Sequence, residues 1–184
     1  MVIAGKKDEA EAILVRTCSA SIAAGCGGLG YLYSIRKDWG KARRYLERGC
    51  ALGDGLVCEG LAQFVSGAEG APPRSDAVAA YRDALPYYRR ACELGVPRTC
   101  AFVAAGISDG IVKGTAAEAL NLYLKACHGA NDTPMACRSA ADLLHTGTAE
   151  SRQLAERFDV ERMTKELLTR GCKLGDRECC KAIE

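Results

Sequence analysis

Apolar residues recur every three to four positions in five segments of the chain, which is the spacing of an amphipathic helix that packs by one face. In each segment the stripe runs up to a cysteine. A small residue or threonine lies eight positions before that cysteine, and apolar residues lie five and four positions before it. We expect each segment to form the first helix of a repeat. The segments are 10–18, 42–50, 84–92, 119–127 and 164–172.

Turn signals follow these helices, most clearly at 51–54, 93–97 and 173–176. Glycine closes a helix in the left-handed conformation, and aspartate or proline favours the start of the next helix. A second apolar stripe then begins near a second cysteine, so each repeat is predicted to be a hairpin of two helices. The fold class is therefore all-α. Pro86 either kinks a helix that begins near Asp76 or marks the first turn of a shorter one.

Ten of the eleven cysteines follow this pattern in five pairs, separated by eight residues or, in one pair, by ten. Cysteines on facing turns of a helix hairpin can reach the Cα separation of about 5.5–6 Å that a disulfide prefers, so we expect one disulfide in each repeat. The remaining cysteine, Cys179, is expected to be a free or intermolecular thiol, and the protein a monomer or a dimer linked through it. The alternative is that Cys179 and Cys180 exchange roles. The predicted pairs are Cys18 with Cys26, Cys50 with Cys58, Cys92 with Cys100, Cys127 with Cys137, and Cys172 with Cys180.

The repeats have a base period of about 35 residues and fill the chain, which predicts a single repeat domain over 1–184. Insertions are expected at about 67–76, a loop rich in glycine and proline, and at about 148–158, a charged stretch. The repeats themselves are expected at about 7–36, 38–68, 76–110, 115–147 and 157–184.

Charge and cysteine content limit the partner and the compartment. The net charge of +2 gives no field that favours nucleic acid, and no stretch approaches the length of a membrane-spanning helix. Paired cysteines are typical of exported proteins, whereas the first residues lack the apolar core of a signal peptide. We therefore expect a periplasmic or secreted protein whose signal peptide has been removed, with a cytosolic thiol protein as the alternative.

No metal site or cofactor is expected. The chain has no C-x-x-C motif, and its only histidines are His128, after a cysteine in a turn, and His145, at a helix end. A histidine beside the last carbonyl groups of a helix is explained by the helix dipole.

A basic residue lies two positions before the first cysteine of every repeat. A cation in the last turn of a helix complements the dipole, worth about 0.3–1 kcal/mol, and this accounts for the pattern without any ligand. The alternative is a binding surface for an extended acidic peptide, because arginine and tyrosine are favoured at binding hot spots. The basic residues are Arg16, Arg48, Arg90, Lys125 and Arg170, and the binding surface would comprise Arg43, Arg44, Arg48, Arg89, Arg90 and Lys125 with Tyr45, Tyr81, Tyr87 and Tyr123.

The segments KARRYLERGCALGDGLVCEGLA (41–62) and DALPYYRRACELGVPRTCAFVA (83–104) resemble the Sel-one-like (Sel1-like) repeat, in particular its cysteine-rich Hcp type. The resemblance implies a right-handed superhelical solenoid of about five disulfide-stapled hairpins, similar to tetratricopeptide (TPR) arrays. It also implies a function, that of a scaffold for a protein or peptide partner. Some Hcp proteins are instead described as slow β-lactam-binding or β-lactam-hydrolysing enzymes.

The enzyme alternative predicts the sequence motifs of a serine β-lactamase. Ser34 and Lys37 match the S-x-x-K motif, in which a lysine handles the proton of a serine nucleophile, but neither S-D-N nor K-T-G occurs. Ser34 is also one copy of a repeat position, eight residues after the second cysteine, where Ser66, Ser108 and His145 lie in other repeats. We therefore expect no catalytic residue, with Ser34 and Lys37 as the candidates if the enzyme alternative holds.

Overall fold

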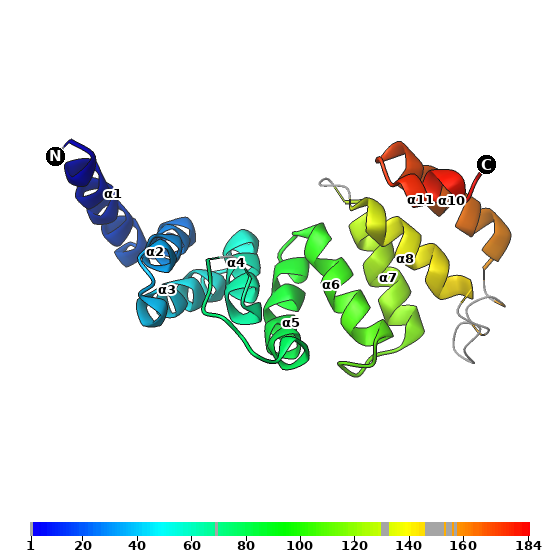
Figure 1. The fold of residues 1–184 in the computed structure, drawn as a ribbon, viewed down its shortest axis with the longest axis horizontal. Helices are drawn as coiled ribbons and strands as arrows, with labels where there is room; N and C mark the ends of the chain where they lie inside the picture. Colours follow the sequence, from blue (N-terminus) through cyan, green and yellow to red (C-terminus); the bar gives the residue numbers. More distant parts are fainter. Residues whose placement is uncertain (1, 69, 130–132, 146–152, 154–155, 157) are drawn as a thin grey trace. The chain divides into compact units, whose positions relative to one another are not determined.

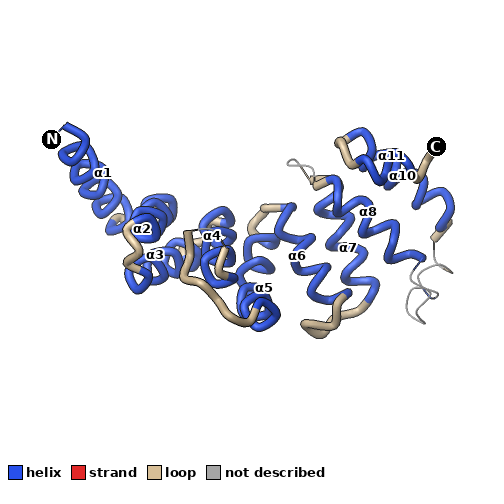
Figure 2. Tube along the Cα trace, viewed as in Figure 1, coloured by secondary structure: helices blue, strands red, loops and turns tan. Residues whose placement is uncertain are grey.

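The computed structural model describes residues 2–184 except 69, 130–132, 146–152, 154–155 and 157, and the side chains from residue 9 onward. Every regular element in this part of the chain is an α-helix (Figure 1). The described helices are joined by short turns and a few longer loops (Figure 2). None of them is long and apolar enough to cross a membrane. The chain divides into two compact units, residues 1–95 and 96–184, which are described separately below.

Unit 1 contains two complete helix hairpins and the first helix of a third. Each helix packs against the next along the chain. Helix α5 is continuous through Pro86, so the proline does not mark a new helix start. The helices are α1 (Val2–Ser19), α2 (Ala23–Ile35), α3 (Trp39–Ala51), α4 (Gly55–Ser66) and α5 (Ala77–Glu93).

Unit 2 contains the second helix of the third repeat and two further hairpins, again with sequential packing. The last helix, α11, has only five residues. Most of the insertion predicted at 148–158 lies outside the described residues. The helices are α6 (Pro97–Ser108), α7 (Ala116–Cys127), α8 (Pro134–His145), α10 (Val160–Lys173) and α11 (Arg177–Lys181).

The turns of the second and fifth repeats have the chemistry expected from the sequence. Gly53 and Gly175 adopt φ of 91° and 96°, the left-handed region that L side chains rarely enter. The aspartate that follows, Asp54 or Asp176, caps the second helix by accepting hydrogen bonds from two backbone N–H groups. In the first repeat Ser21 takes the left-handed conformation without glycine, with φ of 60°.

Within each unit, the disulfides lie across the turns and join the two helices of a hairpin. Most of their cysteines are fully buried and form the centre of the core together with alanines and leucines. Cys92 and Cys100 are also disulfide-bonded, which gives five disulfides in total. The other bonds, with Cα–Cα separations of 4.5–4.8 Å, join Cys18 to Cys26, Cys50 to Cys58, Cys127 to Cys137, and Cys172 to Cys180.

The Cα–Cα distances across these disulfides are shorter than the 5.5–6 Å expected from typical disulfides, because the two helices approach closely at the turn. Cys26 and Cys137, the second cysteines of the first and fourth repeats, are both 0% exposed. Cys137 bonds across the turn that carries two additional residues, and its Cα separation of 4.8 Å is close to the 4.6 Å at Cys26. The insertion in the fourth repeat therefore leaves the position of the disulfide almost unchanged.

A polar cluster joins α1 to the helices that follow it. The Tyr33 hydroxyl donates a hydrogen bond to Glu11 Oε1 over 2.6 Å, and Arg36 forms an ion pair with the same carboxylate. Both bonds favour the ionised form of Glu11 and lower its pKa. The hydrogen bond to Glu11, followed by burial, raises the pKa of Tyr33 to about 12. The Tyr33 ring stacks on Tyr45 of α3 with a centroid distance of 5.5 Å. The cluster therefore fixes the first hairpin on the second.

Candidate functional site: an apolar groove between helices α2 and α4

A groove of about 730 Å³ runs between α2 and α4, the second helices of the first two repeats. Three large apolar side chains border it although they are largely exposed: Tyr31 is 69% exposed, Ile35 63% and Leu56 60%. Leu46 of α3 and Val57 and Phe64 of α4 are buried beneath them. The groove therefore presents apolar side chains to solvent above a packed apolar base.

Glycines form part of the groove wall. Gly27 and Gly28 of α2 and Gly60 of α4 all line it. A Cβ at Gly27 would lie 2.5 Å from Val57 Cγ2, and one at Gly28 would lie 2.5 Å from Leu14 Cδ2, so these two glycines permit close packing. Gly60 differs, because a Cβ there would meet only Leu46 Cδ2, at 3.8 Å. The backbone at Gly60 is thus open to the groove.

The groove lining includes a leucine, Leu46, at a repeat position where the third and fourth repeats have a tyrosine. Four positions before the first cysteine, the third and fourth repeats have Tyr88 and Tyr123, buried tyrosines that hydrogen-bond to Ser66 and Ser108 respectively. Burial raises the pKa of both phenols. The second repeat has Leu46 at this position, which offers no hydroxyl to the equivalent serine, Ser34.

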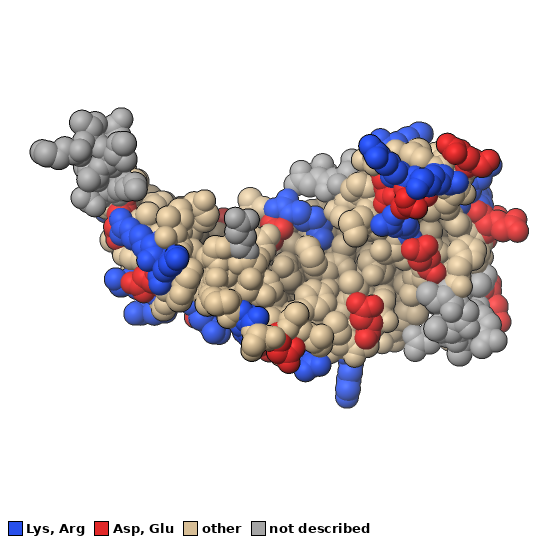
Figure 3. Space-filling view, viewed as in Figure 1, with Lys and Arg blue, Asp and Glu red and all other residues tan. Residues whose placement is uncertain are grey.

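Polar groups in the groove lining are few. They come from Ser34, Gln63, Tyr31 and the N-terminal cap of α4, Asp54, and the loop residues Gly70 and Ala71 complete the lining. None of the lining residues is a lysine or arginine. In the face drawn in Figure 3, the surface over α4 is largely uncharged, whereas lysines and arginines gather beside α2 and α3. The groove therefore selects for apolar groups along most of its length.

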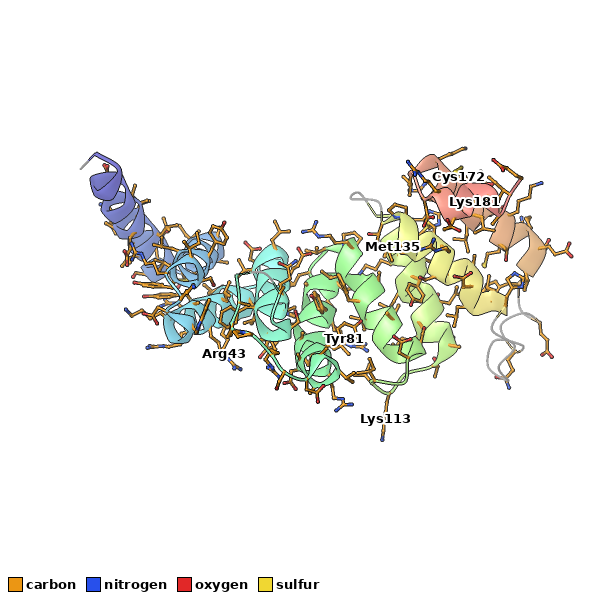
Figure 4. The ribbon with its side chains drawn as sticks, viewed as in Figure 1. Arg43, Tyr81, Lys113, Met135, Cys172 and Lys181 are labelled. Carbon is orange, nitrogen blue, oxygen red and sulfur yellow. A yellow bond between two sulfur atoms is a disulfide. The ribbon has the colours of Figure 1, made fainter. Side chains whose placement is uncertain are left out.

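The structure places the predicted basic residues outside this groove, on the first helices of the repeats. Arg43 forms an ion pair with Glu47 on α3 over 2.8 Å and projects to the lower edge of unit 1 in Figure 4. Arg90 lies with Tyr87 and Glu47 in a smaller pocket of about 350 Å³ between α3 and α5, and it pairs with Glu93. Arg44 and Arg48 are exposed on α3, Arg89 is half-buried on α5, and Lys125 is exposed on α7.

Arg170, the basic residue of the fifth repeat, bonds the C-terminal end of the preceding repeat's first helix, α7, and not that of its own helix, α10. The Arg170 Nε donates a hydrogen bond over 2.9 Å to the carbonyl oxygen of Cys127, the last residue of α7. The cation thus satisfies a carbonyl group that helix geometry leaves without a partner.

Ser34 and Lys37 do not share a helical turn. The Ser34 hydroxyl donates to the Gly30 carbonyl oxygen over 3.0 Å, while α2 ends at Ile35 and Lys37 adopts a left-handed φ of 58°. His128 is exposed after α7, and His145 Nε2 lies 3.0 Å from Thr164 Oγ1. Among the described residues, no three histidine, cysteine or acidic side chains are grouped to hold a metal ion.

Cys179 is a free thiol, and it is buried. It is 0% exposed, and a Cβ built on Gly171 would lie 2.5 Å from its Sγ. Val57 stands at the same repeat position and fills the space beside Gly49 in the same way. Cys179 is therefore a core residue facing a glycine, and a dimer linked through it would require the last hairpin to open.

We predict that the Cys179 thiol reacts with an aromatic disulfide reagent only after unfolding. Burial, followed by the nearby Asp176 carboxylate, raises the pKa of the thiol, so little thiolate is present at neutral pH. Protein prepared without reductant should release no chromophore when native and one equivalent in denaturant. Cys179→Ala should release none in either state. Fast reaction of the native protein, or a covalent dimer on a non-reducing gel, would contradict the burial.

Neither protein-family models nor curated proteins match the sequence. Among solved structures, a Sel1 repeat protein from Oxalobacter formigenes is similar over 94% of this chain and 67% of its own, with a TM-score of 0.66 and 19% identity. YrrB, described as a TPR protein with an unusual peptide-binding site, is similar over 97% of this chain and 83% of its own, with a TM-score of 0.50 and 16% identity. The predicted fold, an all-α array of disulfide-stapled helix hairpins similar to Sel1 and TPR structures, is confirmed.

Proposed function

We propose that the protein is an interaction scaffold and that the groove between α2 and α4 binds an extended peptide segment of its partner. The observation that carries this proposal is the exposure of Tyr31, Ile35 and Leu56 around one glycine-walled groove. Single exposed apolar side chains are common, but a contiguous set around a concavity is typical of binding sites. The peptide-binding site named for the similar TPR protein is consistent with this use of the fold.

The dimensions of the groove suit a short extended peptide. Its volume of about 730 Å³ lies within the range of about 300–1,000 Å³ usual for ligand sites. Helix α4 has 12 residues, so it is about 18 Å long. An extended chain rises about 3.3 Å per residue, and five or six residues therefore span the groove. Ser34 and Gln63 are the lining side chains that can hydrogen-bond to the backbone of such a peptide.

Five disulfides indicate an oxidising environment. We propose that this environment is the periplasm or the outside of the cell. In a reducing cytosol the same cysteines would be held as thiols, and the hairpins would lose the bonds that join their helices.

The groove gives no support to two hypotheses from the sequence, an acidic partner and β-lactam hydrolysis. An acidic partner would suit the arginines on α3 and α5, but these side chains do not line the groove. β-Lactam hydrolysis would need an activated serine, and the Ser34 hydroxyl is hydrogen-bonded to a backbone carbonyl instead. No observation among the described residues favours the enzyme alternative over a scaffold.

We predict that Tyr31→Ala reduces peptide affinity by at least about tenfold, because tyrosine is among the side chains that commonly carry much of the binding energy. The probe is a peptide selected from a random heptapeptide library on the oxidised protein, and the dissociation constant is measured by fluorescence anisotropy. Alanine is a better helix former than tyrosine, so thermal stability should not fall. The matched control is Val78→Ala, an exposed apolar residue of α5 outside the groove, which should leave the affinity unchanged. If no peptide is enriched, or if Tyr31→Ala binds like the wild type, the proposal fails.

A further inference from the structure

Two helices of the protein begin with the same aspartate cap. Asp54 begins α4 and Asp176 begins α11, with closely similar backbone angles (φ −88°, ψ 113° and φ −75°, ψ 108°). In each case Oδ1 accepts hydrogen bonds from the backbone N–H groups two and three residues later, over 2.9–3.2 Å. The two carboxylates therefore stand in equivalent places of two hairpins.

One of these carboxylates has a guanidinium partner within the chain. Arg138, on the second helix of the preceding repeat, places Nη1 3.2 Å from Asp176 Oδ1. The Asp176 side chain is only 7% exposed there and that of Arg138 is 30% exposed, so the ion pair is partly shielded from solvent. The repeat geometry thus provides, beside this cap, a place that fits a guanidinium group.

At the equivalent place beside Asp54, the preceding repeat has a glycine. Arg138 directly follows Cys137, the second cysteine of its repeat, and the residue that follows Cys26 in the first repeat is Gly27. Both Asp54 and Gly27 line the apolar groove. Asp176 is therefore paired with an arginine of the preceding repeat, whereas the equivalent carboxylate, Asp54, faces the groove beside a glycine.

Two further positions beside the groove are apolar in the first two repeats and acidic in the last two. Tyr31 and Leu56, which border the groove, correspond by repeat register to Asp142 and Glu178 in the last two repeats. The exposed apolar pair and the missing arginine thus occur together, at one pair of repeats. Beside Asp54, glycine stands in place of the arginine and the groove is apolar. This site suits a ligand that supplies its own guanidinium group to the Asp54 carboxylate.

We propose that the peptide bound in this groove carries an arginine whose guanidinium group occupies the place beside Asp54, next to apolar residues that contact Tyr31, Ile35 and Leu56. This inference rests on the proposed peptide-binding function and specifies its ligand. Arginine is favoured over lysine because the planar guanidinium matches a carboxylate and is less strongly hydrated than an ammonium group. The Asp54 carboxylate also fixes the direction of the peptide, since it lies at the N-terminal end of α4.

The test compares two libraries of N-acetylated hexapeptides. One contains a single arginine at any position among leucine, phenylalanine, serine and glycine, and the other replaces arginine with citrulline, which has nearly the same shape and no charge. Binding to the oxidised full-length chain is screened by affinity selection and mass spectrometry. The best arginine peptide and its citrulline analogue are then titrated by fluorescence anisotropy against the wild type, Asp54→Asn and Asp76→Asn.

Asparagine is also a good helix cap, so Asp54→Asn removes the charge and keeps the cap. We expect citrulline to weaken binding to the wild type about tenfold, and Asp54→Asn to bind both peptides with the same reduced affinity. Asp76→Asn, at the cap of α5 outside the groove, should behave like the wild type. Equal binding of the two peptides by the wild type, or unchanged arginine binding by Asp54→Asn, would overturn the inference.

The Tyr31→Ala variant separates this inference from the function on which it rests. If peptides from both libraries bind equally and Tyr31→Ala abolishes their binding, the groove is a peptide site and only the arginine assignment is wrong. If neither library binds, or if bound peptides are insensitive to Tyr31→Ala, the proposed function fails together with the arginine assignment.

Discussion

Reduction of the disulfides is expected to unfold this protein at 37 °C, because small disulfide-rich domains commonly depend on these bonds. A bridge that closes a loop of about nine residues contributes about 2.5 kcal/mol in the chain-entropy model. Five such bridges would contribute about 12 kcal/mol if they were additive, which is comparable to the 5–15 kcal/mol of a whole domain. The experiment is a thermal melt followed by circular dichroism, on protein reduced in denaturant and refolded with reductant, since the cysteines are largely buried.

A variant without one bridge gives the same test in a milder form. Cys50→Ala combined with Cys58→Ala should lower the free energy of unfolding by about 2.5 kcal/mol. Cys179→Ala is the control for loss of a buried sulfur atom without loss of a bond. A reduced protein that melts at the temperature of the oxidised one would show that packing alone maintains the hairpins.

Substitution of leucine for Gly60 should abolish peptide binding and leave the fold at least as stable. The new Cβ would meet only Leu46 Cδ2 at 3.8 Å, an ordinary contact, so the rest of the side chain has the groove to occupy. Leucine also favours a helix over glycine by roughly 0.5–1 kcal/mol. We expect the dissociation constant to rise by at least about thirtyfold, the effect of losing a hot-spot contact. Affinity is measured by fluorescence anisotropy with the selected peptide, and stability by urea unfolding.

Two variants show whether the effect is steric and local. Gly60→Ala should raise stability and change affinity only slightly, since a single methyl group fills little of the groove. Gly40→Leu is the matched control on α3, where a Cβ meets nothing within 4 Å and the groove is not involved. Undiminished peptide affinity in stable Gly60→Leu protein would place the peptide elsewhere.

The hairpins and their fold could be predicted from the sequence because the same signals recur along the chain, most completely in the second, third and fifth repeats. The cysteine spacing, the small residue before the first cysteine and the Leu-Gly turn recur together, and the structure uses them as expected: Gly53 and Gly175 close helices in the left-handed conformation. The core positions follow from the same register. Cys179 could have been placed in the core as well, because Val57 and Ala136, at the same repeat position, are apolar and buried.

The groove could not be predicted from the repeat pattern, because it forms where that pattern is broken. Leu46 stands where the third and fourth repeats have a tyrosine, and Gly27 stands where the fourth repeat has Arg138. These absences remove side chains from one surface, and only the packed structure shows that the gaps adjoin. One signal was present in the sequence: Tyr31 and Leu56 are apolar at positions that do not belong to the buried stripe. The repeat pattern favoured the arginines as binding residues instead, because they recur at the same position.

The most direct test of the groove as a peptide site is to map the selected peptide by backbone amide chemical shifts in the isotope-labelled, oxidised protein. We expect the largest shifts on titration to fall on the groove lining, with Gly28, Tyr31, Leu56 and Gly60 among them, and the signals of the arginine-bearing face of α3 to stay in place. Shifts centred on Arg43, Arg44 and Arg48, with no change at Gly60, would contradict the groove as the binding site.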